Sequence, residues 1–221
     1  MSCWTAWLTG SRNRPGGDSP RCTLEIVDTT STGTRALVVV DVQNDFCPGG
    51  ALGTDRGDDV AQKIADFIAD GNGRGEKYSH VVATQDWHID PGAHFSETPD
   101  FVDSWPVHCV ADSEGAALRE PIADVAFDEF FRKGEYEAAY SGFEGASISE
   151  HALLADWLSA RGVEHLDVVG IATDYCVRAT VLDALKEGFG VRVLSSMCSP
   201  VDEDRGSRAL DEMREAGAEI A

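Results

Sequence analysis

Apolar runs of strand length alternate with helical patterns along most of the chain, and this alternation restricts the possible folds more than any other feature. The run 37–42 is apolar apart from Asp41, as expected for a buried parallel strand. A helical pattern follows, with Val60, Ile64 and Phe67 on one face. Strands that alternate with helices favour a parallel sheet with helices on both faces.

The same pattern repeats to the end of the chain and predicts six strands. They lie at 37–42, "YSHVVATQD", "VAFDEFFRKG", "HLDVVGIA", "VRVLSS" and the short "AEIA". Between them we expect four helices: one capped by Asp58, one that Ser149 opens and Gly162 ends, one capped by Thr173 or Asp174, and one over 203–216. The predicted fold is a three-layer α/β/α domain with a mostly parallel six-stranded sheet.

The first 33 residues differ from the rest. They are rich in Ser, Thr, Arg, Gly and Pro and show no sustained periodicity. The start also lacks a basic region followed by an apolar one, so it does not resemble a signal peptide. We therefore expect a flexible extension over 1–33, a folded domain over 34–221, and a cytoplasmic protein.

The charge of the chain restricts its partners. Its 39 acidic and 18 basic residues give a formal net charge of −21 at pH 7. Nucleic acids and anionic membranes both require clustered positive charge, so we expect neither as a partner. The longest apolar run is too short to span a bilayer. A small-molecule partner fits this composition best, and the sequence leaves open whether the protein is a monomer or a homo-oligomer.

Four reactive side chains stand where predicted strands end. Asp41 ends the first strand, Asp86 ends the second, Lys133 follows the third and Cys176 follows the fourth. Ligands of such sheets bind beyond the carboxyl ends of the strands. Each side chain alone is better explained as a cap, a surface charge or a packed thiol. Their common topological position is what predicts a single site.

Cys176 could be a packed thiol, half of a disulfide, a metal ligand or a nucleophile. A domain of this size needs no disulfide, and intracellular thiols usually stay reduced. A better set of metal ligands lies at 86–94. The position of Cys176 in the first turn of a helix, at the same sheet edge as Asp41 and Lys133, favours the nucleophile.

A helix start supplies free N–H groups and a positive dipole end, which should lower the pKa of the Cys176 thiol. The same N–H groups can stabilise an oxyanion. Asp41 is the candidate base for the thiol proton, and Lys133 would orient that carboxylate and offset its charge. A Cys-Asp-Lys set of this kind performs acyl transfer through a thioester.

The stretch "TQDWHIDPGAHF" contains a second cluster. Asp86 and His88 are two residues apart, so they point the same way on an extended segment, and a turn at Pro91 can bring His94 back to them. One carboxylate and two imidazoles suit a divalent metal ion such as Zn, Fe or Mn. His108 is a candidate fourth ligand. The alternative is a loop stabilised by Asp and His hydrogen bonds.

These residues lie in longer stretches that resemble the nicotinamidase members of the isochorismatase-like cysteine hydrolases. The stretches are "ALVVVDVQNDFCPGG", "VVATQDWHIDPGAHFS", "SWPVHCV", "FRKGEYEAAYSGFEG" and "DVVGIATDYCVRAT", in family order over about 35–221. The resemblance implies hydrolysis of nicotinamide to nicotinate and ammonia in NAD salvage, and pyrazinamide as a further substrate.

The resemblance also assigns roles to residues. It implies Asp41, Lys133 and Cys176 as the catalytic triad, and Asp86, His88 and His94 as metal ligands, with His108 matching a ligand found in part of the family. It implies a cis peptide bond between Ile171 and Ala172, and an oxyanion hole formed by the N–H groups of Ala172 and Cys176. The pocket residues that it implies are Phe46, Trp105, Tyr140 and Ile171, with Gln43 beside the site.

One departure from the family lies beside the nucleophile. Tyr175 stands where close relatives often have His, which changes the pocket wall. Three other functions are alternatives: another amidohydrolase of the superfamily, acting on a carbamoyl or different amide substrate; isochorismate ether hydrolysis; and a non-catalytic binding module. The metal cluster disfavours the related amidohydrolase, and the nucleophilic cysteine disfavours isochorismate hydrolysis. The intact triad disfavours a non-catalytic module.

Overall fold

The computed structural model describes residues 34–72 and 77–221. The predicted flexible extension, 1–33, lies outside the described residues. The strands are β1 (Thr34–Val40), β2 (His80–Asp86), β3 (Glu129–Lys133), β4 (Ala146–Ser147), β5 (Val163–Ile171), β6 (Gly190–Ser199) and β7 (Glu219–Ile220). The helices are α1 (Gly57–Phe67), α2 (Leu154–Ala160), α3 (Arg178–Lys186) and α4 (Glu203–Glu215).

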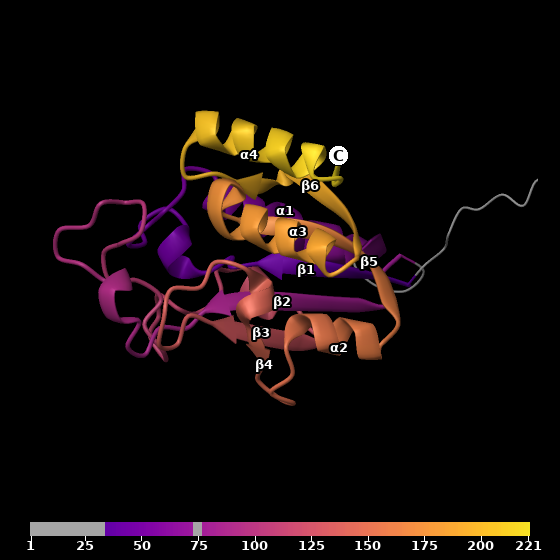
Figure 1. Cartoon of the computed structure of the whole chain (residues 1–221), viewed down its shortest axis with the longest axis horizontal. Coiled ribbons are helices and arrows are strands. Elements are labelled where there is room, and N and C mark those ends of the chain that lie inside the picture. The colour runs from indigo at the N-terminus through magenta and orange to yellow at the C-terminus, as the bar shows by residue number, and fades with distance from the viewer. Residues whose placement is uncertain (1–33, 73–76) are drawn as a thin grey trace, which may run out of the picture. The chain divides into compact units, whose positions relative to one another are not determined.

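Within the described residues the strands form one sheet in the order β4-β3-β2-β1-β5-β6-β7 (Figure 1). All neighbouring pairs are parallel except β3 and β4, which are antiparallel. The predicted α/β fold with a mostly parallel sheet is confirmed, but the sheet has seven strands rather than six. The additional strand is β4, a two-residue segment that joins the sheet by antiparallel pairing with β3.

Strand β1 shows why the fold has three layers. Ala36, Val38 and Val40 pack into a core that includes side chains of α2, α3 and α4. Leu37 and Val39, which point the opposite way, pack into a second core with side chains of α1. Because successive strand residues face opposite sides, β1 is buried in both cores. The helices accordingly lie on both faces of the sheet (Figure 1).

Two predicted helix starts are wrong. The second helix begins at Leu154, not at Ser149. The hydroxyl of Ser149 instead donates to the carboxylate of Glu129, so its hydrogen bond joins a loop to β3. Asp58 lies within the first turn of α1 and does not cap it, since its carboxylate binds Arg119 at 2.8 Å. The local pattern predicts that Ser149 and Asp58 cap helices, but each side chain forms a tertiary contact instead.

The predicted cap of the third helix is also different. The helical turn η6 (Thr173–Val177) precedes α3, and Ala172 is its N-cap residue without a side-chain hydrogen bond. Neither Thr173 nor Asp174 serves as the cap. Asp174 accepts a hydrogen bond from the backbone N–H of Val201 at 2.8 Å, which ties the turn to the chain after β6.

The chain between β2 and β3 runs outside the sheet as the loops at the left of Figure 1. Apart from two short 3-10 turns, η3 (Gly92–His94) and η4 (Ile122–Asp124), it lacks helices in the described residues. Single bridges, His88 to Val110 and Phe95 to Trp105, fix its course. This long segment lies where the parallel strands end, which is the edge at which ligands bind in such folds.

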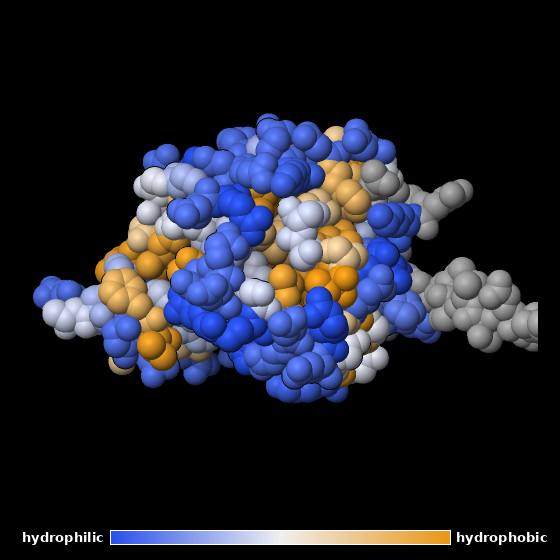
Figure 2. Space-filling view, turned by 90° about the horizontal axis from the view of Figure 1, so that it is seen from above, coloured by the Kyte–Doolittle hydropathy of each residue, from blue (hydrophilic) through white to orange (hydrophobic). Residues whose placement is uncertain are grey.

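Hydrophilic residues cover most of the face drawn in Figure 2, as the charge of −21 leads one to expect. Hydrophobic residues show in patches, one of them toward the end that carries the long loops (Figure 2). Among the exposed apolar side chains are Ile89, Val102 and Val107. No helix among the described residues combines the length and the hydropathy that a membrane crossing requires.

Asp167 on β5 is a buried carboxylate on which the sheet depends. Its side chain is fully buried and accepts hydrogen bonds from Arg35 at 2.5 Å, from Arg192 and from the Tyr78 hydroxyl. Burial acts to raise the pKa of Asp167, but its bonds to Arg192 and Tyr78 hold that pKa below the ordinary value. The carboxylate on β5 therefore links β1, β6 and the segment just before β2.

We expect Asp167→Asn to lower the free energy of unfolding at pH 7 by about 3 kcal/mol, because it leaves two guanidinium groups without their anionic partner. Since the folded pKa is depressed, the wild-type contribution is present above the ordinary pKa of an aspartate and is lost as the pH falls through the folded value. Urea unfolding at neutral and acidic pH measures both effects. Asp183→Asn, at an exposed ion pair, should change stability by less than about 0.5 kcal/mol.

Candidate active site

The four side chains predicted to converge do lie together at the carboxyl edge of the sheet. Asp41 follows β1, Asp86 ends β2, Lys133 ends β3 and Cys176 lies in η6, directly after β5. The register of β2 and β3 pairs Asp86 with Lys133. All four are buried, and ligand atoms of Asp41, Asp86 and Cys176 lie within 4.8 Å of one another.

Lys133 occupies the centre of this group. Its Nζ lies 2.9 Å from Oδ2 of Asp41 and 3.7 Å from Sγ of Cys176, and it also forms an ion pair with Asp86. The ammonium donates to the carbonyl of Ala139 as well, at 3.2 Å. A buried ammonium needs such partners, because an unpaired buried charge is strongly unfavourable. Lys133 therefore holds both carboxylates and the thiol in one arrangement.

The charged side chains in this group shift one another's pKa values. Burial alone would lower the pKa of Lys133, but Asp41, Asp86 and Cys176 raise it well above its usual value, so it stays positive. Burial raises the pKa of Asp41, and Lys133 offsets only part of that rise. Burial also acts to raise the pKa of Asp86, yet Lys133 and the nearby histidines hold it well below its usual range. Of the two carboxylates, Asp41 is the one suited to accept a proton.

The thiol of Cys176 does not have the lowered pKa that its position at a helix start predicts. Burial raises the pKa of Cys176 well above the value of a free thiol; Lys133 opposes this, whereas the charges of Asp41 and Asp86 and a hydrogen bond with Asp41 add to it. Desolvation and two carboxylates therefore outweigh the helix end and the ammonium. The environment of Cys176 therefore disfavours the thiolate, and the carboxylate of Asp41 lies within 4.8 Å of the thiol sulfur.

The backbone before Cys176 has the predicted geometry. The peptide bond between Ile171 and Ala172 is cis. The carbonyl of Ala172 accepts the N–H groups of Tyr175 at 3.1 Å and Val177 at 3.0 Å, which fixes the turn η6. Ala172 and Cys176 both line a cavity of about 400 Å³. Their N–H groups remain the candidate oxyanion donors.

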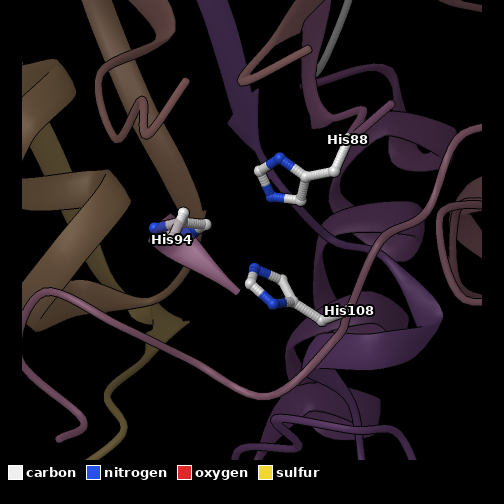
Figure 3. Close-up of side chains that lie close together, drawn as sticks. All are labelled: His88, His94 and His108. Carbon is white, nitrogen blue, oxygen red and sulfur yellow. The ribbon is translucent and has the colours of Figure 1, made fainter. Parts of the chain in front are cut away.

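Three histidines from separate parts of the long loop segment point toward one another (Figure 3). One ring nitrogen each from His88, His94 and His108 lies within 4.8 Å of the others, and all three side chains are buried. Oδ2 of Asp86 lies 3.6 Å from Nε2 of His88 and 3.8 Å from Nε2 of His108. His108, which the sequence marks as the fourth candidate, thus belongs to the same cluster.

The hydrogen bonds of these rings test whether a metal ion fits. Nδ1 of His88 donates to the carbonyl of Gly134 at 2.6 Å, and Nδ1 of His108 donates to that of Pro106 at 2.8 Å. These bonds leave each Nε2 as the lone-pair nitrogen, as in metal sites. Nε2 of His88 and Nδ1 of His94 are buried without a hydrogen-bond partner. Three imidazoles and a carboxylate suit Zn, Fe or Mn.

The environment of His94 keeps its ring neutral, which metal binding requires. Burial and the neighbouring rings of His108 and His88 lower the pKa of His94 to about 4, although Asp86 acts against this. Burial likewise lowers the pKa of His108. At neutral pH two of the candidate ligands are therefore deprotonated before any ion arrives.

The cavity connects the two clusters. Asp86, His94 and His108 line it together with Cys176. The predicted pocket residues Phe46, Trp105 and Tyr140 also line it, whereas Ile171 is fully buried in the core on the α1 side and is not among the lining residues. Gln43 lies beside the site, where its Nε2 donates to the carbonyl of Asp86 at 2.8 Å.

Sequence reasoning did not find every residue of the cavity. Tyr175, which it marks only as a departure from the family, lines the wall, and so do Phe101, Val201 and the loop 50–54. Thr84 was also missed; its hydroxyl donates to Asp41 at 2.6 Å. Thr84 lies two residues after the core residue Val82 and two before Asp86, so all three point to the same face of β2, and this spacing is a signal that could have indicated its role.

Comparisons with known proteins identify the family of the chain. The isochorismatase domain model matches residues 35–221. The nicotinamidase/pyrazinamidase of Mycobacterium tuberculosis is 49% identical over 186 residues, which cover 84% of this chain and 97% of that protein.

Two crystal structures have the same fold. The pyrazinamidase of Pyrococcus horikoshii in complex with zinc superimposes with a TM-score of 0.72 at 39% identity, over 85% of this chain and 98% of the other. PnC1 from L. infantum in complex with nicotinate has a TM-score of 0.72 at 31% identity, over 86% and 93%. The resemblance to nicotinamidases is thus confirmed, and the chain belongs to the isochorismatase family.

Proposed function

We propose that this protein is a nicotinamidase, which hydrolyses nicotinamide to nicotinate and ammonia and also accepts pyrazinamide. The observation that carries the proposal is one cavity with a buried Cys176, Asp41 and Lys133 beside three histidines that converge with Asp86. The similarity to the M. tuberculosis and P. horikoshii enzymes supports it. This activity would serve NAD salvage in the cytoplasm, the compartment that the sequence predicts.

The cavity suits a flat aromatic amide. At one end, Asp86, His88, His94 and His108 would hold a divalent metal ion, which would supply Lewis-acid chemistry for orienting a ring nitrogen or water. At the other end Sγ of Cys176 would face the amide carbon. Phe46 and Trp105 would border the ring between them. Binding at both ends orients the substrate for attack.

The first half-reaction follows from the contacts of Cys176. Asp41 takes the thiol proton as Sγ attacks the amide carbon, because that carboxylate lies within 4.8 Å of Sγ and burial raises the pKa of the thiol. The N–H groups of Ala172 and Cys176 stabilise the oxyanion that forms. Asp41 then gives the proton to the leaving nitrogen, the C–N bond breaks, ammonia leaves and a thioester remains. Lys133 keeps Asp41 in place at 2.9 Å throughout.

The second half-reaction restores the enzyme. Asp41 takes a proton from a water molecule, which attacks the thioester carbon. The oxyanion occupies the same N–H groups, the C–S bond breaks, and the proton returns to Sγ as nicotinate is released. One carboxylate thus serves both halves as base and acid.

Ammonia release from a panel of amides tests the proposal. The full-length protein, with its metal content measured by elemental analysis, should release ammonia from nicotinamide and pyrazinamide faster than from carbamoyl compounds. Release from carbamoyl or other amides alone would replace the proposal with the related amidohydrolase activity. No release from any amide by metal-loaded protein would contradict both.

His94→Ala should lower the bound metal by at least about tenfold after dialysis, before any loss of fold, because it removes a ligand atom that has no other partner. Elemental analysis and circular dichroism measure the two effects. His151→Asn is the matched control, since His151 is exposed and its φ of 57° is one that Asn tolerates. Equal metal content in His94→Ala and wild type would contradict the assignment of His94.

A further inference from the structure

The segment 100–105 forms part of the cavity wall and is a preformed turn. Oδ1 of Asp100 accepts the backbone N–H groups of residues 102–104, each at 2.9 Å. Phe101 and Trp105 line the cavity, with their rings 6.0 Å apart and nearly perpendicular. Because the Phe101 side chain is also half exposed, the turn stands at the rim of the cavity.

Two tyrosine hydroxyls reach the backbone of this turn from the rest of the domain. The hydroxyl of Tyr140 donates to the carbonyl of Val102 and that of Tyr175 to the carbonyl of Phe101, both at 3.4 Å. The indole N–H of Trp105 donates to Tyr140 at 3.0 Å. The two tyrosine rings stack with centroids 6.0 Å apart. The turn is therefore attached through a pair of stacked phenols.

The hydroxyl of Tyr175 has a second partner. It accepts a hydrogen bond at 3.0 Å from Nη1 of Arg205, which lies in the first turn of α4. Arg205 is itself held, because its Nε lies 3.3 Å from Oδ2 of the buried Asp174. One phenol oxygen thus joins α4 to the carbonyl of Phe101 across the rim of the cavity. The hydroxyl of Tyr140, by contrast, contacts Trp105 and Val102, which both lie in the segment 100–105.

We propose that Tyr175 is a positioning and specificity-determining residue, whose hydroxyl bridges Arg205 and Phe101 and holds the turn 100–105 over the cavity. The proposal rests on the proposed function, because the substrate it selects is an aromatic carboxamide. We expect a rim held in this way to limit the width of the ring that can enter, and so to favour a single six-membered ring over a fused bicyclic one. Tyr175 is well suited to this role because it directly precedes Cys176 in η6, whose backbone is fixed by hydrogen bonds to Ala172.

Loss of the hydroxyl should weaken binding more than chemistry. The bridge touches neither the triad nor the histidines, so it favours the ground state and the transition state equally. Tyr175→Phe keeps the ring that stacks on Tyr140 and packs edge-on against Trp105, and it removes only the bridge. We expect KM for nicotinamide to rise about fivefold, the usual cost of one hydrogen bond, with kcat within about twofold.

The test uses the full-length, metal-loaded protein and two readouts. Hydrogen exchange of the amides in 101–105, measured without substrate, should be several-fold faster in Tyr175→Phe. The ratio of kcat/KM for quinoline-3-carboxamide to that for nicotinamide should rise by about fivefold as the rim loosens. Tyr136→Phe is the matched control, because it removes the same hydroxyl from a tyrosine that is 66% exposed outside the cavity.

A second variant removes the bridge from its other side. Arg205→Met should speed exchange in 101–105 and raise KM at least as much as Tyr175→Phe does, since it also removes the ion pair with Asp174. The double variant should match Arg205→Met, because the bridge is already broken in that variant. If Tyr175→Phe does not fold, Arg205→Met decides the question alone.

The proposal is overturned if the bridge variants match Tyr136→Phe in exchange and in KM, or if kcat falls while KM stays constant. Failure of the wild type to hydrolyse nicotinamide would reject the proposed function instead. Exchange in the free protein would still show whether the hydroxyl holds the turn, so the two failures can be told apart.

Discussion

Cys176→Ala is expected to reduce amide hydrolysis by at least about ten-thousandfold, because no other group can form the thioester. Among the described residues, Cys176 is the only cysteine that lines the cavity. The variant should still bind nicotinate with an affinity near that of the wild type, since the substitution removes one sulfur atom from the wall. Ammonia release and calorimetric titration with nicotinate measure the two properties.

Cys198→Ala is the matched control for this experiment. Cys198 is also a buried, free thiol, but it packs in the core between the sheet and α2 to α4. Its replacement should lower stability slightly and leave turnover almost unchanged. Substantial turnover by Cys176→Ala would rule out a cysteine nucleophile, and loss of nicotinate binding together with turnover would indicate a damaged cavity.

Asp41→Asn is expected to lower kcat by about a thousandfold or more, because the amide keeps the shape of the carboxylate but cannot accept the thiol proton. The thiol depends on that acceptor, since burial raises the pKa of Cys176. Asp41→Ala should abolish turnover as well. A rapid-mixing measurement of the first turnover should show that thioester formation and thioester hydrolysis are both slowed, because Asp41 takes a proton in each half-reaction.

Thr84→Ser provides the control for Asp41. Its hydroxyl can still donate to Asp41, as that of Thr84 does at 2.6 Å, so turnover should stay near the wild-type level. If Asp41→Asn retains more than about a tenth of wild-type kcat, another group accepts the proton and Asp41 only positions its neighbours.

The sequence predicts the fold and the sheet edge well because the responsible signals are local. A buried apolar run, a helical period and a polar residue where a strand ends can each be recognised within a few residues. Asp41, Asp86, Lys133 and Cys176 were predicted to meet on that basis, and they do. The β4 strand was missed because it is set by pairing with β3, not by a period of its own.

The protonation of Cys176 could not be predicted in the same way. Its position at the start of a helical turn is visible in the sequence, and that position alone favours a thiolate. The opposing contribution comes from burial and from two carboxylates on other strands, which exist only after folding. Helix starts failed for the same reason: Asp58 and Ser149 look like caps locally, but each binds a distant residue.

The rim of the cavity was the least predictable part of the site. Phe101, Tyr175 and Val201 come from three separate segments, and no spacing in the sequence relates them. The histidine cluster was easier to predict, since His88 and His94 lie in one motif. His108 joins them through the bridge that pairs His88 with Val110, a contact between two loops.

Strand β1 contributes side chains to both cores, and this affects how the domain unfolds. Detaching either helical layer would expose alternate residues of Thr34–Val40 to water, so we expect the two layers to unfold together. Asp41 directly follows that strand, so its geometry should persist only while both layers are folded. A ligand bound at the sheet edge should then stabilise both layers at once.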